Sequence, residues 1–147
     1  MRIIGLDIGS KTIGVAVSDP LGWTAQGLTT LRRCGIKKDL AAVCRYIRDY
    51  GATEVLIGLP LNMNGSRGPS AEAAEQFAAE LEREAGKAGL VIAITMRDER
   101  LSTVAAQRVL LEGDVSRRGR KQVIDKIAAV LILQGYLDYL RQVKGDG

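Results

Sequence analysis

Residues 3–18, IIGLDIGSKTIGVAVS, decide how this chain starts to fold. Two runs rich in β-branched and apolar residues, Ile3–Ile8 and Ile13–Ser18, flank a turn-like segment at residues 9–11. Such runs around a short Gly-containing turn are typical of a β-hairpin. Because Gly27–Leu31 is compatible with a third strand, we expect the chain to open with three successive antiparallel strands.

The remainder of the chain alternates helical and strand-like patterns. Apolar residues at three- and four-residue steps, beginning with Ile36 and Leu40, predict amphipathic helices. We expect strands at 54–59 and 90–96, helices at 36–50, 69–85, 102–111 and 122–143, and a basic loop at 113–121. The order βββαβαβαα predicts an α/β fold: a mixed five-stranded sheet with three antiparallel N-terminal strands and helices on both faces. No repeat or linker divides the chain, so residues 1–147 are expected to form a single domain.

The composition excludes several kinds of enzyme. The chain has no histidine, so it cannot form a Ser-His-Asp triad, a Cys-His pair or a His-ligated zinc site. Cys34 and Cys44 form neither a disulfide framework nor a zinc pattern and fit a reducing compartment. The longest wholly apolar stretch, Ile127–Leu133, is far too short to span a bilayer. We therefore expect a cytoplasmic protein without membrane contact, in which any catalysis uses carboxylates, lysines, hydroxyls or a bound metal.

Asp7 is the first acid whose position suggests chemistry. Alternation along a strand places residues 3, 5 and 7 on one face, where Gly5 leaves room for a neighbouring backbone or a ligand. A carboxylate on such a face is costly unless it is solvated, paired or bound to a cation. In the alternative interpretation Asp7 caps the turn by accepting hydrogen bonds from the amides of Gly9 and Ser10.

A second pair of acids, Asp98 and Glu99, directly follows the last predicted strand. If that strand is parallel to the first, at least one of the two emerges at the same sheet edge as Asp7. The flanking Arg97 and Arg100 leave open a different interpretation, a plain cluster of salt bridges.

Asp125 is the most informative acid because its helical neighbours are apolar. The residues three, four and seven positions later are Ala128, Ala129 and Ile132, so Asp125 lies on an apolar stripe. Small alanines beside it would let the helix approach the sheet closely and bring the acid over the strand ends. The alternative is an acid in the first turn of the helix that complements the helix dipole.

Together these acids predict an oxygen-ligand site that suits Mg²⁺ or Mn²⁺. Two such ions about 4 Å apart activate water and stabilise the leaving oxygen during phosphodiester hydrolysis, and this chemistry needs no histidine. The net charge of +4 favours a polyanionic partner. The residues therefore indicate a metal-dependent hydrolase that acts on nucleic acid.

Four segments in the same order resemble the YqgF family, also called RuvX. They cover nearly the whole chain: GLDIGSKTIGVAVSD (5–19), IGLPLNMNGSRGP (57–69), DERLST (98–103) and DKIAAVLILQGYLD (125–138). The resemblance implies an RNase H-like fold related to the RuvC resolvases. It also implies membership of a family described as Holliday-junction resolvases and as nucleases that mature the 5′ end of pre-16S ribosomal RNA. The family's acidic site falls on Asp7, Glu99 and Asp125, with Glu99 chosen over Asp98 as the ligand.

The candidate nucleic-acid contacts are basic or amide side chains near these motifs. They are Lys11, Asn62, Asn64, Arg97, Arg100, Arg117, Arg118, Arg120 and Lys121. Lys11 either contacts a phosphate or belongs to a simple turn, and the two asparagines either orient substrate or stabilise their loop. The basic run at 117–121 is interpreted as a nucleic-acid clamp, with a solvated loop as the alternative.

Three classes of function follow from these patterns. The leading one is a metal-dependent endonuclease for structured RNA, most of all pre-16S rRNA. The alternative is resolution of four-way DNA junctions, which would favour a homodimer, and the sequence is compatible with a monomer or a homodimer. The loop at Gly5–Lys11 also suggests an ATP-using phosphotransferase, but the chain is long enough for only one of the two domains that such enzymes use. A non-catalytic binding module is the third class, and it would have no need of the three acids.

Overall fold

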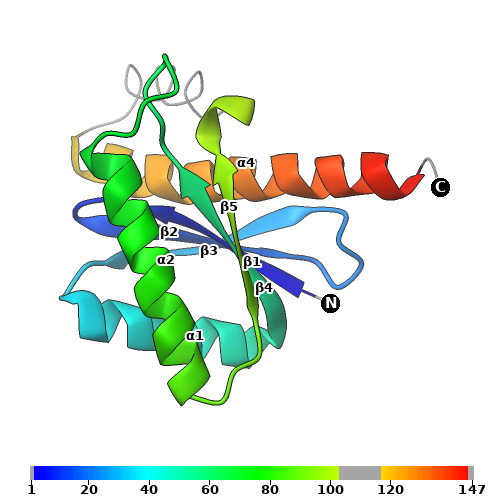
Figure 1. Cartoon of the computed structure of the whole chain (residues 1–147), viewed down its shortest axis with the longest axis horizontal. Helices are drawn as coiled ribbons and strands as arrows, with labels where there is room; N and C mark the ends of the chain where they lie inside the picture. Colours follow the sequence, from blue (N-terminus) through cyan, green and yellow to red (C-terminus); the bar gives the residue numbers. More distant parts are fainter. Residues whose placement is uncertain (1, 103–116, 146–147) are drawn as a thin grey trace.

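The structure, a computed structural model, describes the backbone of residues 2–102 and 117–145; within the last helix it describes side chains from 126 to 144. The elements in chain order are β1 (Arg2–Ile8), β2 (Thr12–Ser18), β3 (Ala25–Arg32), α1 (Ile36–Tyr50), β4 (Ala52–Leu59), α2 (Pro69–Lys87), β5 (Ala93–Asp98), the short 3₁₀ helix η1 (Glu99–Leu101) and α4 (Arg117–Gly145). Figure 1 shows how they are arranged.

The strands form one mixed sheet with the order β3-β2-β1-β4-β5. β1, β2 and β3 pair antiparallel, as the N-terminal hairpin pattern predicted, and β1, β4 and β5 run parallel. The predicted five-stranded α/β sheet is therefore confirmed. Because β1, β4 and β5 are parallel and adjacent, their carboxyl ends lie at one edge of the sheet.

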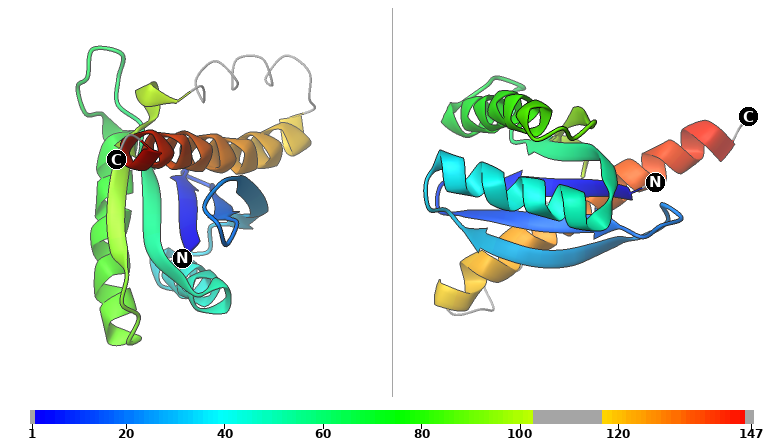
Figure 2. Two further views of the ribbon diagram at one scale, coloured as in Figure 1. Left: turned by 90° about the vertical axis from the view of Figure 1, so that its right-hand side faces the viewer. Right: turned by 90° about the horizontal axis from the view of Figure 1, so that it is seen from below.

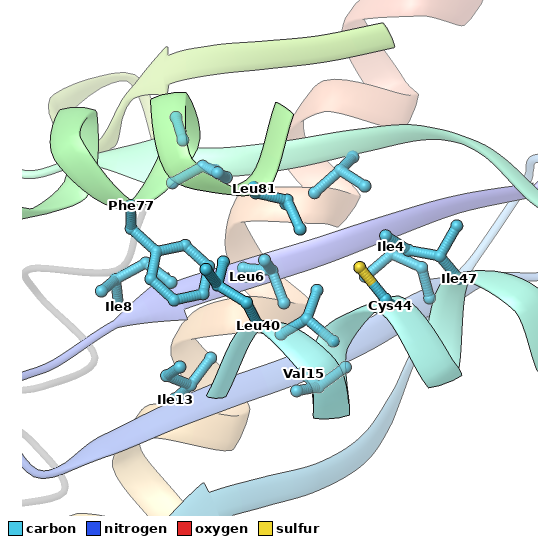
Figure 3. Close-up of a cluster of buried hydrophobic side chains, with 14 of the residues drawn as sticks. Ile4, Leu6, Ile8, Ile13, Val15, Leu40, Cys44, Ile47, Phe77 and Leu81 are labelled. Carbon is cyan, nitrogen blue, oxygen red and sulfur yellow. The ribbon is translucent and has the colours of Figure 1, made fainter. Parts of the chain in front are cut away.

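Helices cover both faces of the sheet, as expected, with α1 and α2 on one face and α4 on the other (Figure 2). Alternation along β1 explains the division, since Ile4, Leu6 and Ile8 pack toward α1 and α2. There they meet Phe77 of α2 and the apolar side of α1 in the larger core (Figure 3). Ile3, on the other face, belongs to the smaller core formed with α4.

α4 approaches the sheet closely because glycines lie beneath it. A Cβ atom added to Gly5 would lie 3.0 Å from Leu133 Cβ and 3.4 Å from the carbonyl oxygen of Ala129. A Cβ added to Gly58 of β4 would lie 2.6 Å from Ile132 Cδ1. The room that Gly5 was predicted to leave is thus occupied by α4, through the Leu133 side chain and the Ala129 carbonyl oxygen, rather than by a ligand.

Some predicted boundaries were wrong. The last helix begins at Arg117, so residues 117–121 of the predicted basic loop are helical. Arginine and lysine are good helix formers, and the single Gly119 among them does not stop a helix that is anchored further along by packing on the sheet. β5 begins at Ala93, not Leu90. The helix expected after Ser102 falls mainly on residues 103–116, which lie outside the described residues.

Within the described residues, no helix combines the length and the apolar character needed to cross a membrane. α4 is long enough, but charged and polar side chains are spread along it.

Candidate active site

The carboxyl ends of β1, β4 and β5, with η1 directly after β5, form the region that we call the carboxyl edge. In the strand register Leu6 pairs with Ile57, and Leu59 pairs with Asp98. Asp7 follows Leu6 in β1, so it lies level with Gly58 on the neighbouring strand. The loop after β4 and η1 both project from this edge (Figures 1 and 2).

Asp7 is buried, with an exposed fraction of only 5%. It shares the α4 side of β1 with Gly5 because the two residues are two positions apart on the strand. The turn that follows is closed by the backbone itself, since the Gly9 amide donates to the Thr12 carbonyl oxygen at 2.9 Å. The turn therefore has a closure that does not depend on the Asp7 carboxylate.

Glu99 is the second buried acid of the carboxyl edge, with an exposed fraction of 7%. Its Oε1 atom lies 2.9 Å from the position that a Cβ on Gly58 would occupy. Ile132 of α4 approaches the same glycine, so the Glu99 carboxylate lies between the end of β4 and α4. Since Gly58 is level with Asp7 on the adjacent strand, the two carboxylates lie on the same face at neighbouring strand ends.

Asp98 has different surroundings from Glu99. Its Oδ1 accepts the amide of Arg100 at 2.9 Å and so begins η1, and its Oδ2 accepts Nη2 of Arg100 at 2.8 Å. These bonds with the Arg100 guanidinium hold the pKa of the Asp98 carboxyl below its usual range. Asp98 thus shapes the loop, whereas Glu99 points into the space beside α4.

Asp125 lies on α4, one helical turn before Ala129, whose carbonyl oxygen is close to Gly5. α4 therefore carries position 125 on the side of the sheet where Asp7 and Glu99 lie. The side chain of Asp125 is outside the described residues. The described side chains alone include no group of three metal-binding residues. The two described acids nonetheless fit a hard cation, because both are buried carboxylates on one face of the carboxyl edge.

The loop after β4 contains Asn62 and Asn64, whose side chains bond within the loop. Asn62 Nδ2 donates to Ser66 Oγ at 2.9 Å, and Asn64 Oδ1 accepts both the amide and the hydroxyl of Ser66. Arg100 Nη1 donates to the Met63 carbonyl oxygen at 3.2 Å and ties this loop to η1. These contacts favour the interpretation that the two asparagines stabilise their loop.

The predicted basic contacts are dispersed. Lys11 is exposed on the turn between β1 and β2. Arg97, on β5, stacks against two tyrosines of α4, with its guanidinium carbon 5.9 Å from the Tyr136 ring centroid and 5.3 Å from that of Tyr139. The basic run at 117–121 occupies the first turns of α4, and its side chains are outside the described residues.

Sequence reasoning missed one ion pair near the carboxyl edge, between Arg33 and Asp39. Asp39 is buried with an exposed fraction of 4%, although an acid in the first turn of a helix is usually explained by the helix dipole alone. The signal available in the sequence is weak: an arginine precedes and an aspartate follows Ile36, where α1 begins.

Comparison with known proteins assigns the chain to a family. Residues 1–139 match the family RuvX, described as Holliday junction resolvase. A Moorella thermoacetica protein designated a pre-16S rRNA nuclease is 61% identical over 97% of this chain and 98% of its own length. A Myxococcus xanthus protein with the same designation is 56% identical over 99% of this chain and 93% of its own length.

Solved structures share the fold at low sequence identity. Thermus thermophilus RuvC in complex with a Holliday junction substrate superposes with a TM-score of 0.61 at 12% identity, covering 97% of this chain and 96% of RuvC. The fowlpox virus Holliday junction resolvase gives a TM-score of 0.55 at 17% identity, covering 95% of this chain and 99% of that protein. The fold is thus the RNase H-like fold of the RuvC resolvases. Because the family match and the relatives both extend over nearly the whole sequence, this chain belongs to the RuvX family.

Proposed function

We propose that this protein is a metal-dependent endonuclease that hydrolyses phosphodiester bonds in the precursor of 16S rRNA. The observation that carries the proposal is the pair of buried carboxylates, Asp7 and Glu99, on one face of the carboxyl edge. Folding buries the Asp7 carboxylate at the end of β1 and the Glu99 carboxylate beside Gly58 at the end of β4, and a bound cation would offset the cost of removing these charges from water. A site that only held the fold together would not need two such groups.

In this proposal Asp7, Glu99 and Asp125 hold Mg²⁺ or Mn²⁺. The bound metal would supply an activated water and stabilise the leaving oxygen. The protein residues keep the carboxylates in place: β1 fixes Asp7, η1 fixes Glu99, and the glycines under α4 bring the helix that carries Asp125 against the sheet. Lys11 and the basic run at 117–121 would attract the phosphate backbone.

The substrate assignment draws on the relatives, which are designated pre-16S rRNA nucleases and match over nearly their full lengths. Because these relatives are bacterial, the proposal includes a cytoplasmic location. A four-way DNA junction is the second candidate substrate, and it is favoured by the description of the family as Holliday junction resolvase. Cutting a junction symmetrically would require a homodimer with two opposed sites, whereas RNA processing needs only the single domain of one chain.

The test is cleavage of two labelled substrates, a precursor 16S rRNA 5′ segment and a four-way DNA junction, with Mg²⁺, Mn²⁺ or EDTA. We expect metal-dependent cutting of the RNA that is lost in Glu99→Gln and largely kept in Asp98→Asn. The two substitutions remove adjacent negative charges, so the difference between their cleavage rates reports on the Glu99 carboxylate, which faces α4. Asp49→Asn, at an exposed position near the end of α1, is the control for charge removal in general.

Each other outcome has a distinct meaning. Symmetric nicking of the junction without RNA cleavage would contradict the RNA nuclease and support a resolvase that acts in DNA recombination. Loss of activity in Asp98→Asn but not in Glu99→Gln would exchange the roles of these two acids. Binding of RNA with no metal-dependent cleavage of either substrate would contradict the nuclease and favour the binding module.

A further inference from the structure

An ion pair holds the carboxyl edge from the side of the sheet opposite to α4. Arg33 directly follows β3, and its Nε lies 3.0 Å from Oδ2 of Asp39 in the first turn of α1. The other oxygen of Asp39 accepts the amide of Cys34 at 2.9 Å. The Asp39 side chain is 3% exposed and that of Arg33 is 22% exposed, so the pair is largely shielded from water.

The Arg33 guanidinium also reaches the turn that follows Asp7. Its Nη1 donates to the carbonyl oxygen of Gly9 at 3.0 Å, and the Arg33 amide donates to the carbonyl oxygen of Lys11 at 2.9 Å. Gly9 is two residues after Asp7, with only Ile8 between them. One side chain therefore joins the end of β1 to the start of α1.

A third contact of the guanidinium is with an aromatic ring. The Arg33 Cζ atom lies 5.7 Å from the ring centroid of Phe77, which is 2% exposed and belongs to the same core as Ile8. The guanidinium thus has a carboxylate, a carbonyl oxygen and an aromatic ring as partners. Lysine has a single compact ammonium group and cannot reproduce this planar fork.

Stability alone is a poor explanation for this arrangement. A shielded ion pair gains little over apolar side chains of similar volume, because removing both charges from water offsets their attraction. The surrounding core is apolar and would accept such a replacement. What the pair provides, and apolar side chains would not, is a directed hydrogen bond to the Gly9 carbonyl oxygen beside Asp7.

We infer that Arg33, oriented by Asp39, is a positioning residue that holds the end of β1 and thereby the Asp7 carboxylate; its effect on catalysis rests on the proposed nuclease function. The residue does not touch the reacting atoms, because it acts from the face covered by α1 and α2. Partners that orient metal-binding side chains typically change activity about 10- to 100-fold when they are removed.

The first measurement is amide hydrogen exchange of residues 8–12 in the intact protein, compared between wild type, Arg33→Met, Arg33→Lys and Asp39→Asn. We expect about tenfold faster exchange of these amides in Arg33→Met, with a smaller increase in Arg33→Lys. Asp39→Asn nearly preserves the shape of its side chain and covers the case in which Arg33→Met does not fold. Arg83→Met is the matched control, since it breaks an exposed ion pair with Glu80 on α2.

The second measurement is the kinetics of cleavage of the substrate that the wild type cuts. In Arg33→Met we expect kcat to fall about 10- to 100-fold with KM nearly unchanged, and Arg33→Lys to recover part of the loss. A purely structural role would instead lower the amount of folded enzyme, which thermal melting detects.

Unchanged exchange at residues 8–12 would overturn the inference whatever the kinetics. Faster exchange with an unchanged kcat would also overturn it, because Asp7 would then not depend on the ion pair. A wild type that cuts neither substrate would contradict the proposed nuclease instead. In that case the exchange rates still decide whether Arg33 holds the end of β1, with faster exchange supporting it and unchanged exchange refuting it.

Discussion

The carboxyl edge and the opposite end of the sheet both contain acids, but they use them differently. At the carboxyl edge Asp7 and Glu99 are buried with exposed fractions of 5% and 7%. At the opposite end Asp19 begins the loop between β2 and β3 and is partly exposed. Its carboxylate accepts hydrogen bonds from the amides of Leu21, Trp23 and Thr24 and from the Thr24 hydroxyl.

The surroundings of Asp19 are those of a structural acid. These donors lie within five residues of Asp19 along the chain, so the acid closes its own loop. Gln134 of α4 then ties this loop to the helix by accepting the Ala25 amide at 2.9 Å and donating to the Trp23 carbonyl oxygen at 3.0 Å. Asp19 is thus satisfied by its own loop. The acids at the carboxyl edge come from distant parts of the sequence and meet on one face.

The largest expected effect is the difference in cleavage rate between removing one negative charge at the carboxyl edge and removing one at the opposite end of the sheet. We expect Asp7→Asn to lower the cleavage rate about 10³-fold, because a metal ligand contributes several kcal/mol to transition-state stabilisation and each 1.36 kcal/mol is about tenfold. Asp19→Asn should leave the rate within about twofold, since Asp19 is at the far end of the sheet. Single-turnover cleavage by the two variants makes the comparison. Equal losses would show that the two ends do not differ in function.

A substitution of Gly58 at the carboxyl edge, compared with a glycine away from it, is expected to have a smaller effect. Gly58→Ala would put a methyl group 2.6 Å from Ile132 Cδ1 and 2.9 Å from Glu99 Oε1, so it must displace Glu99, α4 or both. We expect the free energy of unfolding to fall by about 1–3 kcal/mol and the cleavage rate to fall about 10- to 100-fold. Denaturant unfolding and cleavage kinetics measure the two effects.

The matched control for Gly58→Ala is Gly86→Ala on α2, where an added Cβ meets no atom within 4 Å. It should stabilise the protein by about 0.5–1 kcal/mol and leave cleavage unchanged, because alanine is the better helix former. An active and stable Gly58→Ala would contradict the close packing of α4 over Glu99.

The smallest effect concerns pH and Asp19. The hydrogen bond from the Thr24 hydroxyl and those from the loop amides hold the pKa of the Asp19 carboxyl well below its usual range. Because the pKa is lower in the folded state, the stability from Asp19 is fully present above the unfolded pKa of about 4 and is lost as pH falls below it. The melting temperatures of wild type and Asp19→Asn should therefore differ at pH 7 and converge toward pH 2. A difference in melting temperature that stays constant from pH 7 to pH 2 would contradict the lowered pKa of Asp19 in the folded protein.

Local patterns predicted much of the fold. The hairpin of β1 and β2 was predicted because two apolar, β-branched runs flank a short turn, and the whole of α1 because its apolar residues recur at helical spacing. The start of α4 was not, because Arg117–Lys121 has no apolar period and a helix there depends on packing further along the chain. The ion pair between Arg33 and Asp39 was missed for a related reason, because a contact between residues at the ends of two elements produces no periodic pattern in the sequence.

The sequence was sufficient to name three acids, to exclude histidine chemistry and to predict a mixed sheet with helices on both faces, because residue type and spacing carry that information. The family resemblance had already chosen Glu99 over Asp98, but only the tertiary structure showed how their surroundings differ: Asp98 bonds Arg100, whereas Glu99 lies beside Gly58, because adjacent residues in an extended segment differ in direction and not in chemistry. The tertiary structure also showed that Gly5 and Gly58 make room for α4, and that Arg33 ties the end of β1 to α1. These properties arise from contacts between residues far apart in the chain, and such contacts exist only once the sheet and helices have packed together.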